Sequence, residues 1–262
     1  MSHIELFIKK IKLNVMNIRK IFLLLNIVLL NGLFTFGQTV IKDEYEFPIK
    51  QGTKEWEQFE KIEDRIAALQ IPDVVLKKLS TESLLETCLK FPYLTDIFFY
   101  DNYQLGFEAL MNEFNGFQEL IKRSDLINVL IKKSQNFKED VRSIRLQNDI
   151  EIGRFSFRHF VLGFMLAQDI VLENLSLEQE KQLILLSTEN KNIKKSYSDI
   201  FGNWTDIPVN LFFAKIIIND PNLKFESDEQ KKALSDFIQS PAYILDQRII
   251  GFVEDFVNVK FK

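Results

Sequence analysis

Two residues of the chain could act as a nucleophile and its base. Cys88 is the only cysteine, and His159 is one of two histidines. A thiolate activated by an imidazole is a common hydrolytic pair. Cys88 lies, however, in the middle of an apolar helical stripe, whereas reactive thiolates usually lie at helix N-termini or beside cations. We therefore expect Cys88 to be a core residue rather than a catalytic one.

Basic residues surround His159 in the segment RFSFRHF. Arg154 and Arg158 are four residues apart and share one face of a predicted helix. Together with His159 they form a candidate site for a carboxylate or phosphate group of a ligand. The favoured alternative is that the arginines pair with surplus surface acids, which is a common arrangement, and that His159 is hydrogen-bonded in the interior.

No cofactor site is predicted. Beyond residue 37 the chain has one histidine and one cysteine, so a zinc, copper or haem site would need carboxylates as its other ligands. The glycines are too scattered to build a phosphate-binding loop, and nucleophile motifs such as Gly-x-Ser-x-Gly are absent. Carboxylate pairs are numerous, Asp96 with Asp101 and Glu108 with Glu113 among them, so they carry little information. A hydrolase acting through two carboxylates is kept as an alternative.

The segment NKNIKKSYSDIFGNWTDIP, residues 190–208, is predicted to be a long loop, because it joins two apolar helical segments and is itself too polar for the core. It carries Tyr197, Phe201 and Trp204. Aromatic residues in long loops often anchor partners, which makes these three residues a candidate binding loop. The alternative is that the loop folds its rings back onto the helices.

A second concentration of aromatic residues is FFYDNYQLGFEAL, residues 98–110. The chain has 25 phenylalanines, 6 tyrosines and 2 tryptophans, and phenylalanine lacks the polar group that suits tyrosine and tryptophan to wet binding surfaces. Most of these rings are therefore expected in the core. Tyr100, Asp101 and Asn102, at the end of a predicted helix, form a candidate exposed binding corner.

Apolar residues recur at helical spacing from residue 54 onward, and no convincing strand pair occurs. One helix is expected to carry Trp56 and Leu69 on the same face, another to end at Asn115–Gly116, and residues 155–167 to form the central buried helix. Helix starts are indicated by Thr53, Pro72, Ser80, Pro92, Ser176, Pro208, Ser227 and Ser240. The pattern predicts an all-α fold, an irregular bundle or compact array of about ten short helices, with a weaker indication of helical-hairpin repeats.

The N-terminus resembles a secretory signal peptide, with a basic pair at Arg19–Lys20, an apolar run from Ile21 and small residues up to Gly37. Cleavage after Gly37 is expected, starting from either Met1 or Met16. The alternative, an uncleaved anchor, is disfavoured because the run is shorter than the roughly 20 apolar residues of a spanning helix. The expected organisation is a signal peptide at 1–37, an extended leader at 38–53 and a single all-α domain at 54–262. Without a cysteine at the cleavage site, a lipoprotein is not expected.

The net negative charge of the chain excludes two classes of partner. The whole chain has a formal charge of −4, and removal of residues 1–37 leaves 28 basic and 36 acidic residues, a charge of −8. An acidic surface does not attract nucleic acid or anionic lipid. No integral membrane segment is expected after cleavage. The expected partner is an unidentified protein or envelope component.

The run from Ile71 to Asp125 resembles a group of secreted, uncharacterised helical proteins from Bacteroidota. The similar pieces are LSTESLLETCLKFP, YDN with GF following, and FNGFQEL. The resemblance implies a secreted helical protein and carries over no activity and no catalytic residue.

Three functions are compatible with the sequence. The leading hypothesis is a periplasmic or secreted interaction module without catalytic activity. The first alternative is a hydrolase acting through carboxylates, which predicts a deep cleft containing an acid of raised pKa. The second alternative is a carrier of an apolar ligand, which predicts a cavity lined by phenylalanine.

Overall fold

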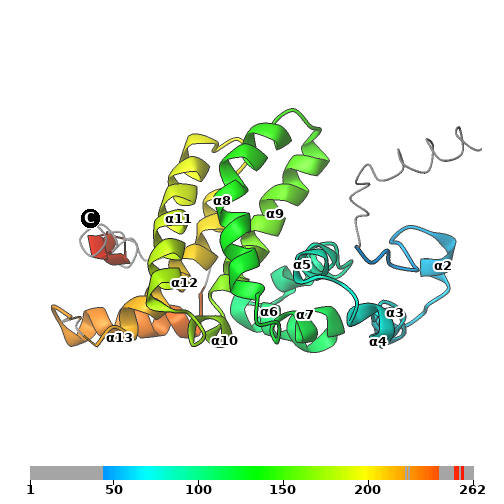
Figure 1. Ribbon diagram of the computed structural model, residues 1–262, viewed down its shortest axis with the longest axis horizontal. Helices are drawn as coiled ribbons and strands as arrows, with labels where there is room; N and C mark the ends of the chain where they lie inside the picture. The colour runs from blue at the N-terminus through cyan, green and yellow to red at the C-terminus, as the bar shows by residue number, and fades with distance from the viewer. Residues whose placement is uncertain (1–43, 222, 224, 242–250, 254, 257–262) are drawn as a thin grey trace, which may run out of the picture. The chain divides into compact units, whose positions relative to one another are not determined.

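The computed structural model describes residues 44–221, 223, 225–241, 251–253 and 255–256 (Figure 1). The predicted signal peptide and most of the helix expected after Ser240 lie outside these residues. Every regular element among the described residues is helical, which confirms the all-α class. The described residues belong to one compact unit.

The first half of this unit is built from short elements. They are α2 (Lys54–Glu57), α3 (Ile62–Ala68), α4 (Asp73–Leu76), α5 (Thr81–Cys88), η1 (Leu94–Phe99, a 3-10 helix), α6 (Tyr103–Glu113) and α7 (Asn115–Leu120). The second half contains the longer helices, which are α8 (Leu126–Ile144), α9 (Asp149–Leu166), α11 (Leu177–Ser196), α12 (Ile207–Ile218) and α13 (Asp228–Gln239). Two short elements lie between them, α10 (Asp169–Leu172) and η2 (Asn203–Asp206).

Four helices of the second half form a bundle. Helix α8 packs on α9 and α11, and α12 packs on the same two helices from the other side (Figure 1). The prediction of a central helix at residues 155–167 holds for the second half of α9, where Phe160 to Leu166 are all buried. Helix α12 is buried more completely, from Ile207 to Ile217. The two helices approach closely, since a Cβ atom on Gly163 would lie 2.7 Å from Cβ of Pro208.

The first half has its own aromatic centre. Phe91 and Phe114 stack with their ring centroids 4.3 Å apart, and Phe47 packs against both. The backbone N–H of Tyr45 also donates a hydrogen bond to Oγ1 of Thr87, at 3.1 Å. The part of the predicted leader that the structure describes, residues 44–53, has no regular element and contains bends and a turn, and it packs on the helices rather than standing apart from them.

Local capping determines several helix starts as predicted. The hydroxyl groups of Thr53, Ser80 and Ser227 accept hydrogen bonds from the first turns of α2, α5 and α13. Ser176 and Gln179 form the full reciprocal capping box that opens α11.

Two helix boundaries differ from the prediction. The expected single helix from Trp56 to Leu69 is divided into α2 and α3, and the Arg65 guanidinium donates to the carbonyl oxygen of Phe59 in the break between them. Asn115 begins α7 instead of ending α6 in a left-handed turn, because its side-chain amide forms hydrogen bonds to both the N–H and the C=O of Ile71.

Candidate functional site

The expected loop at residues 190–208 is mostly helical. Helix α11 continues to Ser196, and only residues 197–202 lie between it and η2. Two of the polar residues that suggested a loop, Lys191 and Lys194, are buried with partners. Nζ of Lys191 donates to Oδ1 of Asn210 and Nζ of Lys194 donates to the carbonyl oxygen of Thr205, each at 2.9 Å. The prediction of a long exposed loop is therefore wrong.

The three aromatic residues of that segment turn toward the helices, as the alternative interpretation held. Phe201 is buried and its ring centroid lies 5.6 Å from that of Phe137. Trp204 is half-buried and packs edge-on against Phe160 at 4.9 Å. Tyr197 lies beneath the guanidinium of Arg145, at 5.5 Å. Trp204 and Phe201 therefore contribute to the core more than to an exposed surface.

Lys194 is a basic residue in a buried position, which is unusual for a lysine. Burial lowers its pKa from 10.5 to about 8, although the nearby Asp206 carboxylate opposes the shift. Its ammonium also lies 5.8 Å from the centre of the Phe201 ring. A charge held here at neutral pH destabilises the fold unless neighbouring groups compensate for its lost hydration.

The arginines and the histidine of α9 do not act as one group. Nη1 of Arg154 pairs with Glu151 at 2.6 Å on the exposed side of the helix. His159 instead packs edge-on between Phe137 and Phe155, with centroid distances of 4.6 and 4.4 Å. No hydrogen bond to His159 is found among the described residues, contrary to the expectation for an interior histidine. Arg158 likewise makes no hydrogen bond or ion pair within this part of the chain.

Two adjoining hollows meet at His159. The inner cavity, of about 50 Å³, lies inside the bundle and is lined by residues that include Phe137, Ser187 and Lys194. Such a volume holds one or a few water molecules and no lipid, so this cavity does not fit the carrier hypothesis. The second hollow, which we call the side pocket, has a volume of about 350 Å³ and lies where α5, α8 and α9 meet.

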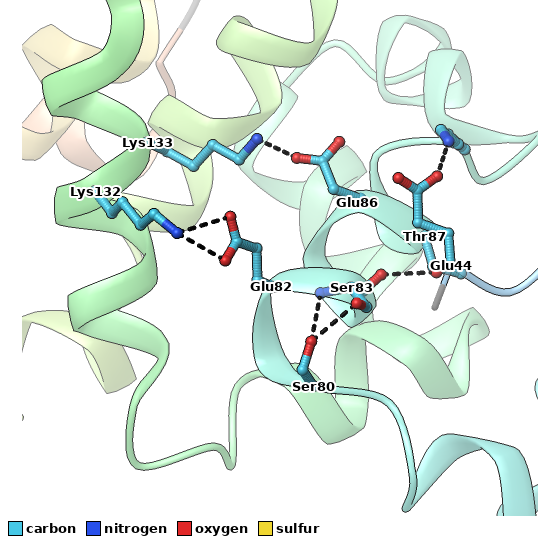
Figure 2. A network of polar contacts seen from close by, with 9 residues as sticks. Glu44, Ser80, Glu82, Ser83, Glu86, Thr87, Lys132 and Lys133 are labelled. Atoms are coloured by element: carbon cyan, nitrogen blue, oxygen red, sulfur yellow. Dashed lines mark hydrogen bonds and ion pairs between the residues drawn. The ribbon is translucent and has the colours of Figure 1, made fainter. Parts of the chain in front are cut away.

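Charged residues of both signs line the side pocket. Glu86 from α5 and Lys133 from α8 form an ion pair across it. Figure 2 shows this pair beside a second one, in which Lys132 contacts Glu82 at 3.0 Å, so that two lysines of α8 reach toward α5. Asp140, about two helical turns after Lys133 on α8, completes the charged set together with Arg158.

Burial and the charged residues of the side pocket shift the pKa values of two of its residues, His159 and Asp140. Burial, followed by the charges of Lys194, Lys133 and Arg158, lowers the pKa of His159 well below its usual range, so the imidazole is neutral at pH 7. Burial raises the pKa of Asp140, with Glu86 adding to the shift and Lys133 opposing it. An acid of raised pKa in a pocket is a feature that the hydrolase hypothesis predicted, and the second carboxylate that lines this pocket, Glu86, is engaged in the ion pair with Lys133.

Sequence reasoning found Arg158 and His159 but missed the other residues of the side pocket. Glu86, Lys133 and Asp140 come from two other helices, and only the fold brings them to α9. A weak signal exists, since Lys133 and Asp140 are seven residues apart and therefore share one face of α8.

An exposed apolar surface lies at the junction of η1 and α6. We call it the aromatic corner. It consists of Phe98, Phe99, Tyr100 and Leu105, all of them exposed. Most of the other phenylalanines that the structure describes are buried, as predicted, which makes this group an exception.

The predicted corner residues lie at this surface, with different local roles. Tyr100 belongs to the aromatic corner and Asp101 is exposed beside it. Asn102 caps α6, its Oδ1 accepting hydrogen bonds from the backbone N–H groups of Gln104 and Leu105. Its Nδ2 donates to the carbonyl oxygen of Gln239, at 2.8 Å. Asn102 therefore fixes the position of the corner.

The cysteine, the carboxylate pairs and a metal site are the other chemical candidates, and they are less well supported than the side pocket. Cys88 is fully buried, and burial raises the pKa of its thiol well above the usual range, in agreement with a core cysteine. Burial raises the pKa of Glu113, and the charge of Asp96 adds to that shift, so these two acids, one from each of the pairs noted in the sequence, interact with each other. Among the described residues, no group of three or more His, Cys, Asp and Glu side chains could hold a metal ion.

Comparison of the chain with protein-family models, curated proteins and solved structures finds no match. Of the helices in the described ranges, none combines the length and the apolarity needed to cross a membrane.

Proposed function

We propose that the protein is a secreted or periplasmic helical module that binds another protein through the aromatic corner. The observation that carries this proposal is the 83% exposure of the Phe99 side chain, next to three further exposed apolar residues. Keeping such a group in water does not stabilise the fold, and contiguous exposed apolar groups are typical of interaction surfaces.

One ring of the aromatic corner, that of Phe98, is held in place by packing, which suits it to binding. Phe98 packs its ring against Phe157 and Phe160, with centroid distances of 5.2 and 5.5 Å. The backbones also approach closely, since a Cβ atom on Gly106 would lie 2.8 Å from the carbonyl oxygen of Ile97. A surface that is already ordered loses little conformational entropy when a partner binds.

The surroundings of the aromatic corner indicate what its partner presents. Asp96 and Asp101 lie close to Phe99 in the sequence, and Asp101 is exposed. A protein surface with an apolar recess rimmed by lysine or arginine would complement both the rings and these acids.

The test is retention of a partner by immobilised protein in an envelope extract, compared between wild type and Phe99→Ser. Leu177→Ser is a matched control, because Leu177 is 88% exposed but lies away from the aromatic corner, at the start of α11. We expect Phe99→Ser to weaken retention at least about tenfold, as loss of an interface anchor does, and Leu177→Ser to leave it unchanged. Equal retention by Phe99→Ser and wild type would contradict the proposal, as would retention of lipid or glycan in place of protein.

Secretion rests on the sequence of residues 16–37 alone. If the segment is a cleaved signal peptide, protein recovered from the periplasm or the medium begins at Gln38. N-terminal sequencing checks this directly, and an intact N-terminus on the exported protein would show that the segment is an anchor.

A further inference from the structure

The side pocket contains two opposite charges, each of which makes no hydrogen bond or ion pair with another described residue. Glu86 and Lys133 neutralise each other in their ion pair. Arg158 and Asp140 form neither a hydrogen bond nor an ion pair within the described part of the chain, although both line the same pocket. A half-buried guanidinium and a half-buried carboxylate are thus available to a ligand.

The rest of the lining is suited to a small apolar group with polar ends. Leu89, Phe155 and Leu162 supply an apolar wall, and Ser143 and Gln147 supply hydrogen-bonding groups. The volume of about 350 Å³ lies at the lower end of the range for small-molecule sites. It has room for a molecule the size of an amino acid or a dipeptide.

The net charge of the lining limits the charge of that molecule. Two basic and two acidic side chains cancel, and His159 is held neutral between three cations. A simple anion would be attracted by Arg158 but would approach Glu86 and Asp140 as well. A ligand that carries one charge of each sign would place each beside its complement.

We propose that the side pocket binds a small zwitterion, a free amino acid or a short peptide with an apolar side chain. Its carboxylate pairs with Arg158, its ammonium group with Asp140, and its side chain packs on Phe155 and Leu162. Because this pocket lies between α5, α8 and α9, the proposal is independent of the aromatic corner.

The experiment is isothermal titration calorimetry on the full chain with four probes: leucine, leucyl-leucine, N-acetyl-leucine and leucine amide. We expect leucine or leucyl-leucine to bind with a dissociation constant below about 1 mM. Blocking either charge should weaken binding at least about tenfold, the effect of losing one charge-assisted hydrogen bond. Tighter binding of leucine assigns the pocket to free amino acids, and tighter binding of leucyl-leucine assigns it to peptides.

Matched variants separate the pocket from the general surface charge. Arg158→Gln and Asp140→Asn should each weaken binding at least about tenfold. Their controls, Arg154→Gln and Glu139→Gln, remove the same charges from adjacent exposed ion pairs and should leave binding unchanged. The proposal is overturned if no probe binds, if N-acetyl-leucine and leucine amide bind as tightly as leucine, or if the control variants lose as much affinity as the pocket variants.

Discussion

Replacing Lys194 with methionine should remove a rise in the free energy of unfolding that the wild type shows as the pH increases from about 8 to 10.5. Methionine keeps a similar unbranched stem and removes the ammonium group that burial destabilises. The pKa of Lys194 is lowered from 10.5 to about 8 in the folded protein. This difference corresponds to about 3 kcal/mol of unfavourable free energy for the charged form.

The sign of the effect follows from where the proton is lost. Below pH 8 the lysine is charged in both the folded and the unfolded chain, so its contribution to stability is constant. Between pH 8 and 10.5 the folded protein releases the proton while the unfolded chain keeps it, and the free energy of unfolding therefore rises with pH. Relative to the Lys194→Met variant, the wild type should gain about 2 kcal/mol between pH 7 and pH 9.5.

Urea unfolding of both proteins at intervals between pH 7 and 9.5 measures this gain. Taking the difference between the two proteins cancels the titration of groups that they share. Lys181→Met serves as the control, since Lys181 is exposed on the same helix and its removal should leave the pH dependence unaltered. A constant difference between wild type and Lys194→Met over this range would refute the argument that Lys194 is buried as a charged group.

Two further predictions concern α9. Gly163→Ala should destabilise the fold by about 1 to 3 kcal/mol, because the new methyl group meets Pro208. Gly153→Ala, in open space on the same helix, should stabilise the fold by about 0.5 to 1 kcal/mol. If urea unfolding shows that both variants change the free energy of unfolding in the same direction, the close packing of α9 on α12 is contradicted. The second prediction is that His159→Leu removes a loss of stability that the wild type shows on acidification. As the pH falls below about 6.5, the histidine of the unfolded chain takes up a proton while folded His159 stays neutral. The free energy of unfolding of the wild type therefore falls by up to about 1.4 kcal/mol per pH unit below pH 6.5. If the variant and the wild type lose stability in parallel between pH 7 and 5, His159 is not held neutral.

Features that depend on neighbouring residues could be predicted from the sequence. Ser80 and Ser176 cap their helices through hydrogen bonds that span three residues, so the local pattern contains the whole interaction. The end of α11 could not be predicted in that way. Its buried lysines depend on Asn210 and on the carbonyl of Thr205, which lie 19 and 11 residues away from their donors.

The candidate sites also combine residues that could be predicted from their sequence neighbours with residues that only the fold brings together. Arg158 and His159 are neighbours in the sequence and could be singled out, whereas Glu86 and Asp140 reach them only through the packing of three helices. The exposure of Phe99 also escaped prediction. Phenylalanine was expected in the core because it lacks a polar group, but the 3-10 helix η1 buries Ile97 and leaves Phe98 and Phe99 exposed at its end.

The contact between the aromatic corner and Trp204 makes the protein its own optical reporter. The ring centroids of Phe98 and Trp204 lie 5.7 Å apart, so an indole that is half-buried in the fold touches a residue of the proposed binding surface. The other tryptophan, Trp56, stacks on Tyr93 in a different part of the molecule. In a Trp56→Phe background the emission spectrum would come from Trp204 alone, so that occupation of the corner could be followed in solution without any attached label.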